Sequence, residues 1–196
     1  MKRDARASIL RAVLDLFQER ANLTFTFEEL ARRAGVSRQT LYAHFADRAT
    51  LFVALADHTR SQLDARALTA AVYNADSAVE ALAATVDFHM AYTMQILGPY
   101  RAIEIERARD PAVSAAFAGR DVGKQQTVRH VVTRLKAEGQ LAASWTVDSA
   151  TDLVAALLSA SVSAELVEQR GWTLAELRER LLLTLQRTLL VDERRT

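Results

Sequence analysis

The chain of 196 residues contains no cysteine, only two prolines and only six glycines. The absence of cysteine excludes a disulfide framework, a thiolate metal site and a cysteine nucleophile, and it fits a reducing compartment. Because nearly all prolines and glycines fall between stretches of helical periodicity, the sequence predicts an all-α fold. Half of the residues are hydrophobic, which allows a sizeable core and excludes a disordered chain.

Net charge is also nearly absent, at +1, so the distribution of charge is more informative than its sum. Residues 1–60 hold ten basic and seven acidic side chains, a balance of +3 that leaves −2 for the remainder. This asymmetry weakly favours a polyanionic partner for the N-terminal third. The first eleven residues lack the apolar run of a signal peptide, and no later stretch has eighteen apolar residues without a charged or strongly polar one. We therefore expect a cytoplasmic protein without a membrane partner.

Helical periodicity predicts short helices first and long helices afterwards. Three short helices are expected at 4–20, from Phe27 to Gly35, and from Arg38 to about Phe45. Longer helices are expected at 48–70, 77–97, 99–109, 111–138, 148–169 and 173–191. The sequence thus predicts a helix-turn-helix domain over residues 1–50 and a helical ligand-binding and dimerisation domain over residues 51–196.

Residues 26–51 have the spacing of a helix-turn-helix. Thr26 can cap the second helix, Gly35 can adopt the left-handed turn that follows it, and Ala31 is small where the two helices cross. Leu41 and Phe45 are four residues apart and point back to the core. The opposite face of the third helix offers hydrogen-bond donors, as a reader of the major groove requires. These donors are Arg38, Gln39, Tyr42 and His44.

The segment AGVSRQTLYAHFADRATL, residues 34–51, resembles the signature of the TetR (tetracycline repressor) family. The resemblance is dense over about residues 8–56 and architectural beyond them. It implies an N-terminal three-helix head joined by a long helix to a C-terminal helical body. It also implies a homodimer that binds double-stranded, near-palindromic operator DNA and responds to a small, largely apolar effector. Repression is the common mode of the family, and transcriptional activation is the alternative.

The resemblance further implies two kinds of DNA contact. Arg38 and Gln39 would face base edges, where arginine suits guanine and glutamine suits adenine. Phosphate contacts would come from Thr26, Thr40, Tyr42, His44 and Arg48. Tyr42 could also pack its ring against the fourth helix. This chain departs from the family in having Arg48 where lysine is frequent, and in having the acidic Glu28 where some relatives contact DNA.

An effector pocket is expected among the central helices, as in members of the family. The helix around residues 86–96 is apolar nearly all round, which usually means that it is buried. Large aromatic side chains with a few polar groups are also typical of a small-molecule cavity. The candidate pocket residues are Phe88, His89, Tyr92, Tyr100, Glu104, Phe117 and Trp145.

The last helix has apolar residues on more than one side, which predicts a dimer. One stripe, formed by Leu174, Leu177, Leu181, Leu185 and Leu189, can serve the core of a single subunit. Other apolar residues of this helix and of the preceding one would then form a four-helix interface between two subunits. The candidate interface residues are Leu153, Leu157, Val162, Leu182, Leu183 and Leu190.

Enzymatic and metal-binding functions have little support in the sequence. GRDVGK at residues 119–124 has glycines spaced one residue too closely for a phosphate-binding loop, and no strand precedes it. No HExxH motif and no GxSxG motif occurs. We expect no enzyme, no metal site and no cofactor. A helical protein-interaction module without DNA binding is a further alternative, against which the donors of the third helix argue.

Overall fold

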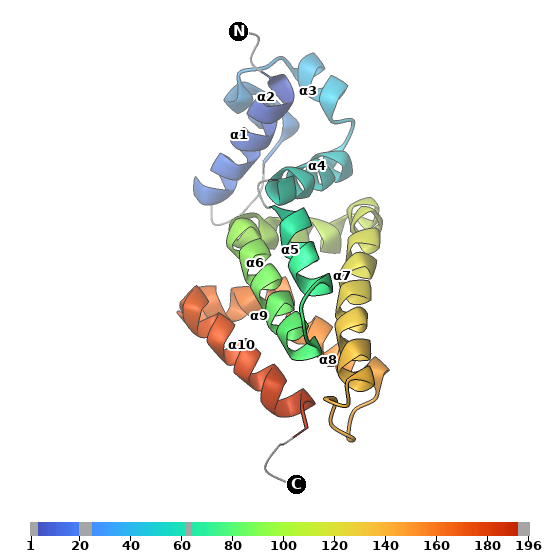
Figure 1. Cartoon of the computed structure of the whole chain (residues 1–196). Helices are drawn as coiled ribbons and strands as arrows, with labels where there is room; N and C mark the ends of the chain where they lie inside the picture. Colours follow the sequence, from blue (N-terminus) through green and yellow to red (C-terminus); the bar gives the residue numbers. More distant parts are fainter. Residues whose placement is uncertain (1–3, 20–24, 62–63, 192–196) are drawn as a thin grey trace. The chain divides into compact units, whose positions relative to one another are not determined.

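The computed structural model describes residues 4–19, 25–61 and 64–191 (Figure 1). Most of the described residues are helical, and Leu141 and Leu190 form an isolated antiparallel bridge. The all-α prediction is confirmed. The helices are α1 (Ala5–Glu19), α2 (Phe27–Ala34), α3 (Arg38–His44), α4 (Arg48–Ser61), α5 (Ala65–Tyr73), α6 (Ala78–Arg109), α7 (Pro111–Ala137), α8 (Val147–Leu157), α9 (Ala160–Ala164), the π-helical η1 (Glu165–Gln169) and α10 (Leu174–Leu189).

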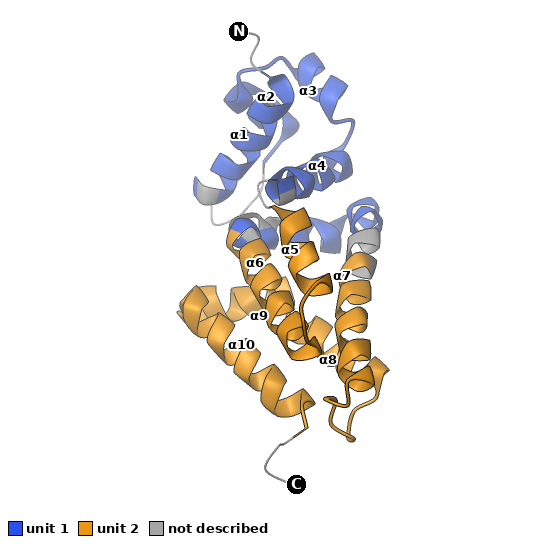
Figure 2. Ribbon diagram, in the orientation of Figure 1, with its two compact units in different colours: residues 1–62, 95–119 blue, residues 63–94, 120–196 orange. Residues whose placement is uncertain are grey.

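The chain divides into two compact units, which Figure 2 shows in different colours. The head unit comprises Met1–Gln62 and Gln95–Gly119, and the body unit comprises Leu63–Met94 and Arg120–Thr196. Helices α6 and α7 each contribute to both units. This division does not coincide with the predicted boundary at residue 50, because α4 and residues 95–119 belong to the head unit.

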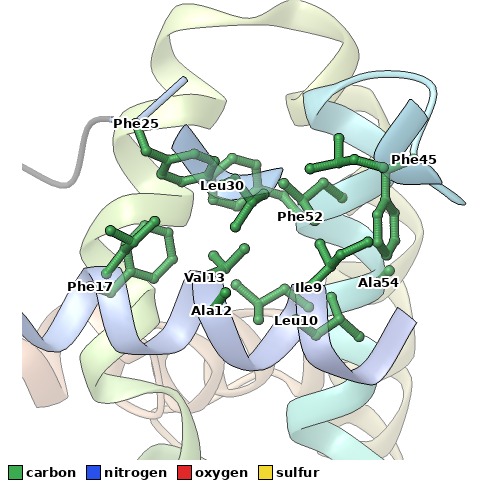
Figure 3. Packing of buried hydrophobic residues seen from close by; sticks show 14 of the residues in the cluster. Ile9, Leu10, Ala12, Val13, Phe17, Phe25, Leu30, Phe45, Phe52 and Ala54 are labelled. Atoms are coloured by element: carbon green, nitrogen blue, oxygen red, sulfur yellow. The ribbon is translucent and has the colours of Figure 1, made fainter. Parts of the chain in front are cut away.

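The core of the head unit is assembled from the apolar face of α1 and from aromatic side chains (Figure 3). Ile9 and Val13 of α1 are fully buried. The rings of Phe17, Phe25 and Phe52 lie 5.9 to 6.4 Å apart. Residues distant in the sequence complete the same cluster, namely Ile103 of α6 and Val113 and Phe117 of α7.

Local signals determine the short helices of the head, as predicted for Thr26 and Gly35. Thr26 Oγ1 accepts a hydrogen bond from the backbone N–H of Glu29 (3.1 Å) at the start of α2. Gly35 ends that helix with φ +67°, which suits a residue without Cβ. Ser37 Oγ accepts from the backbone N–H of Thr40 (3.0 Å) at the start of α3. The two helices are therefore separated by a turn of only three residues.

The body unit has its own core, to which α10 contributes one face. Leu177, Leu181, Leu185 and Leu189 are buried, whereas Leu174 is half-buried. They join residues of α6, α7 and α8 in one cluster. This face is the stripe predicted to serve the core of a single subunit.

The long helices differ from the prediction in three places. The helix expected at 48–70 ends at Ser61, and α5 begins separately at Ala65, where Asp64 accepts from the N–H of Ala67 (2.9 Å). The helix expected at 148–169 is interrupted after Leu157, and Ser159 caps α9 by accepting from the N–H of Val162 (3.3 Å). In both cases a short polar side chain competes for the backbone and starts a new helix.

The third difference is at Pro99, which was expected to separate two helices. Instead α6 is one helix of 32 residues that continues through this proline. Proline removes one backbone hydrogen bond from a helix interior, a cost that tertiary packing must offset. Met90 and Ile103, on either side of Pro99, are both buried, each in the core of a different unit.

Candidate nucleic-acid interface

Helix α3 exposes the side chains predicted to read DNA. Arg38 and Gln39 are exposed in its first turn, whereas Leu41 is fully buried. Phe45, the residue after the helix, is also buried. The two apolar anchors fix the rotation of α3, so that its polar face points to solvent.

The other predicted phosphate ligands of the head have additional local roles. Thr26 and Thr40 take part in the caps of α2 and α3, and the hydroxyls of Thr40 and Ser37 are 2.8 Å apart. The ring of Tyr42 lies 5.3 Å from that of Phe27, yet 48% of this residue is exposed. Tyr42 therefore packs its ring against α2, and its exposure fits a side chain with an apolar body and a polar tip. His44 is exposed at the end of α3.

Arg48 differs from the other predicted contacts, because its guanidinium is bound inside the head unit. It donates two hydrogen bonds of 2.8 Å to the two carboxylate oxygens of Glu106 and one of 2.9 Å to the carbonyl of Phe25. It also lies over the rings of Phe25 and Phe52, at 4.7 and 5.5 Å from their centroids. These bonds use three of the five N–H donors of the guanidinium.

Glu106 was not identified from the sequence, although the structure makes it the main partner of Arg48. Only 6% of Glu106 is exposed, so its carboxylate needs a hydrogen-bonded cation to offset the loss of water. It lies 58 residues from Arg48 in the chain, beyond the reach of any periodic signal.

We predict that Arg48→Met lowers the free energy of unfolding by about 3–5 kcal/mol, because it leaves a buried carboxylate unpaired. The double variant Arg48→Met, Glu106→Leu removes both charges and should be distinctly more stable than the single variant. Urea denaturation of the three proteins measures this difference. A double variant no more stable than Arg48→Met would show that the buried charge is not the cause.

Two ion pairs of the head link α2 to its neighbouring helices, one at each end of α2. Glu28, in the first turn, is 3.6 Å from the guanidinium of Arg38. Arg33, in the last turn, forms an ion pair with Glu19 of α1. An open depression of about 510 Å³ surrounds the first pair. Its lining consists of Thr26, Glu28, Glu29, Ala31, Arg32, Val36 and Arg38.

The predicted pocket residues are divided between the two units. Phe88, His89, Tyr92 and Trp145 belong to the body unit, and Tyr100, Glu104 and Phe117 belong to the head unit. Several of them have partners within their own unit. Trp145 Nε1 donates to the carbonyl of Thr188 (2.7 Å), Glu104 pairs with Arg107 (3.0 Å), and Phe117 lies in the head core beneath Arg107.

His89 is the centre of a buried polar group in the body unit. Its Nε2 lies 2.9 Å from Ser163 Oγ and 3.3 Å from Thr93 Oγ1, and only 8% of the residue is exposed. Burial, with a smaller effect of the Lys124 charge, lowers the pKa of His89 to about 4. The imidazole is therefore neutral near pH 7 and can exchange hydrogen bonds with both hydroxyls. Among the described residues, no group of three or more His, Asp or Glu side chains is placed to hold a metal ion.

The lowered pKa of His89 predicts a loss of stability in mild acid. The unfolded chain takes up a proton near pH 6.5, whereas the folded chain resists it until about pH 4. The contribution of neutral His89 to the free energy of unfolding is therefore complete above pH 6.5. It is lost as the pH falls towards 4, and the loss is at most about 3 kcal/mol. Urea denaturation of the wild type and of His89→Gln at pH 7.5, 6, 5 and 4.5 measures it. Equal pH dependence in the two proteins would contradict the assignment.

All six predicted interface residues are partly exposed in the single chain. Leu153, Leu157, Leu182 and Leu190 also pack against the body core, whereas Val162 and Leu183 lie outside that cluster. The stretch Val147–Gln169 is long and apolar enough to span a membrane by composition, with a mean hydropathy of 1.5, but it is broken into α8, α9 and η1. In the most apolar 18-residue window of this stretch, 33% of the residues are buried.

Comparison with known proteins identifies relatives of the head. Residues 9–55 match the model of the family described as bacterial regulatory proteins, tetR family. This segment contains α2, α3 and the exposed donors of α3. A comparison with curated protein sequences gives no match.

Solved structures resemble the chain over almost its whole length. A TetR-family transcriptional regulator from Rhodococcus sp. is 19% identical with a TM-score of 0.73, over 93% of this chain and 97% of that chain. A transcriptional regulator from Saccharomonospora viridis in complex with choline has 16% identity and a TM-score of 0.76, over 96% and 99%. NalD, the secondary repressor of the MexAB-OprM multidrug efflux pump in Pseudomonas aeruginosa, has 24% identity and a TM-score of 0.72, over 96% and 98%. The predicted fold, a helix-turn-helix head with a helical body, is confirmed.

Proposed function

Since the chain carries the DNA-binding head of the TetR family on the fold of that family's regulators, we propose that it is a ligand-responsive repressor. It would bind a near-palindromic operator as a homodimer and release it when a small, largely apolar molecule enters the body. The observation that carries the DNA-binding part is the row of exposed donors on α3, held outward by the buried Leu41 and Phe45.

The exposed donors divide into those suited to bases and those suited to phosphates. Arg38 can donate two hydrogen bonds to guanine O6 and N7, and Gln39 can pair with adenine N6 and N7. Tyr42, His44, Thr26 and Thr40 offer single donors that suit phosphate oxygens, and Arg48 retains two N–H groups for the same purpose. Phosphate contacts of this kind position α3, while base contacts select the sequence.

The apolar surface of α8 to α10 supports a homodimer. Apolar side chains such as Leu157, Val162 and Leu183 are only partly buried in one chain, so a second copy could cover them further. The candidate interface residues are on α8, α9 and α10, so two copies could form a four-helix interface. A two-fold dimer presents two heads to half-sites separated by turns of the DNA helix.

Helix α6 offers a route from a ligand in the body to the DNA-binding head. His89 and Glu106 are both residues of this one helix. Glu106 holds Arg48, the first residue of α4, so a shift of α6 would move the start of α4. One similar structure, from Saccharomonospora viridis, is described in complex with choline, which supports a small-molecule site in a body of this fold. NalD, described as a repressor, supports repression over activation.

We predict that Arg38→Ala and Gln39→Ala each reduce the preference for operator over random DNA by about 5- to 150-fold, the ~1–3 kcal/mol of a good base contact. Fluorescence anisotropy over a salt series, with an operator selected from random DNA, measures the effect. Affinity must also fall as salt rises, because phosphate binding releases counterions.

Arg66→Ala is the matched control, since it removes an exposed arginine of α5, outside the head. It should leave both the sequence preference and the salt dependence unchanged. Binding that does not weaken with salt, or equal losses on operator and random DNA for Arg38→Ala, would contradict the proposed reading face.

We also predict a dimer at micromolar concentration that Val162→Glu or Leu183→Glu converts to a monomer, because a charge would be buried in the interface. These two residues lie outside the body core, so the fold of the single chain should survive. Ile105→Glu replaces an exposed apolar side chain of the head unit and serves as the control. Sedimentation velocity that gives a monomer for the wild type would refute the homodimer.

A further inference from the structure

The ion pair between Glu28 and Arg38 places an acidic side chain beside the residue most suited to read DNA. The two charged groups come from different helices, α2 and α3, and are 3.6 Å apart. Both side chains are exposed, by 74% for Glu28 and 64% for Arg38. They line the same open depression as Thr26 and Arg32.

An exposed carboxylate is unfavourable on a surface that approaches phosphates, since it repels them. The exposed ion pair contributes little to folding, and the position of Glu28 in the first turn of α2 gives its carboxylate a favourable interaction with the helix dipole. A carboxylate is useful at a base edge that offers a donor. In the major groove cytosine N4 is such a donor, and glutamate accepts from it.

The two groups are direct neighbours on the surface. Arg38 Nη1 and the nearer carboxylate oxygen of Glu28 are 3.6 Å apart, the separation of an ion pair. Successive bases along one strand are also neighbours, about 3.4 Å apart along the helix axis. One can therefore address a guanine while the other addresses an adjacent cytosine, and each charge orients the other before DNA arrives.

We propose that Glu28 is a specificity-determining residue that reads a cytosine next to the guanine read by Arg38. This inference rests on the proposed DNA-binding function. It adds a base position recognised by α2 to those recognised by α3. At the cytosine position a guanine or a thymine places acceptor atoms against the carboxylate, so Glu28 disfavours those bases as well as favouring cytosine.

Selection of bound sequences from random double-stranded DNA tests the proposal with four proteins. The wild type should select a cytosine next to a guanine in each half-site. Glu28→Ala should lose the cytosine without gaining another base. Glu28→Gln should exchange cytosine for adenine, because an amide can pair with adenine N6 and N7. Glu19→Gln, which also removes an arginine-paired carboxylate from the head, should select the wild-type site.

Binding to the selected operator with this cytosine replaced by thymine gives a second measurement. The wild type should lose affinity by about 5-fold or more, the ~1 kcal/mol lower limit of a base contact, and Glu28→Ala should lose none. A cytosine preference that survives in Glu28→Ala, or that is absent from the wild type, would overturn the inference. If the wild type selects no sequence and binds no DNA, the proposed function fails with it. If it selects a site that Glu28→Ala also selects, only the role of Glu28 fails.

Discussion

The head unit depends on the pairing of one buried carboxylate. Removing Glu106 from water costs several kcal/mol unless a cation with hydrogen bonds replaces the solvent. Arg48 provides this with two N–H groups, and its guanidinium lies over Phe25 and Phe52, whose rings pack on Phe17. The pair joins the start of α4 to α6 across 58 residues of sequence. Helix α3 is thereby flanked by α2, which it follows after a tight turn, and by an α4 whose first residue is fixed.

The boundaries of the short helices could be predicted from the sequence, whereas those of several long helices could not, and the difference has a physical reason. Thr26, Gly35 and Ser37 act on backbone groups within three to five residues of themselves, so their effect is readable from the local sequence. The continuity of α6 through Pro99 depends on burial of its two halves in the cores of two units, which no local pattern reports. Asp64 and Ser159 each start a new helix. The sequence does not distinguish them from the short polar residues that occur inside other helices.

The reading face was predictable in part, because helical periodicity separates Gln39 from Leu41 and Phe45. Arg38 shares the side of these two residues by periodicity and is exposed at the first position of the helix. The ion-pair partners of individual charged side chains could not be predicted from the sequence. Arg48 could be assigned to DNA from its position, yet its bond to Glu106 depends on the meeting of distant helices. The surroundings of His89 show the same limit, since Ser163 reaches it from 74 residues away.

The discontinuous head unit has a consequence for folding during synthesis. Its second segment, Gln95–Gly119, supplies Glu106 and several core residues, so the head cannot be completed when α4 leaves the ribosome. Glu106 is synthesised 58 residues after Arg48, which corresponds to several seconds of translation at roughly 5–20 residues per second. During this interval Arg48 has no carboxylate partner and Phe52 lacks part of its packing. A nascent chain halted before Gly119 would thus be a substrate for chaperones, even though its helix-turn-helix sequence is entirely synthesised.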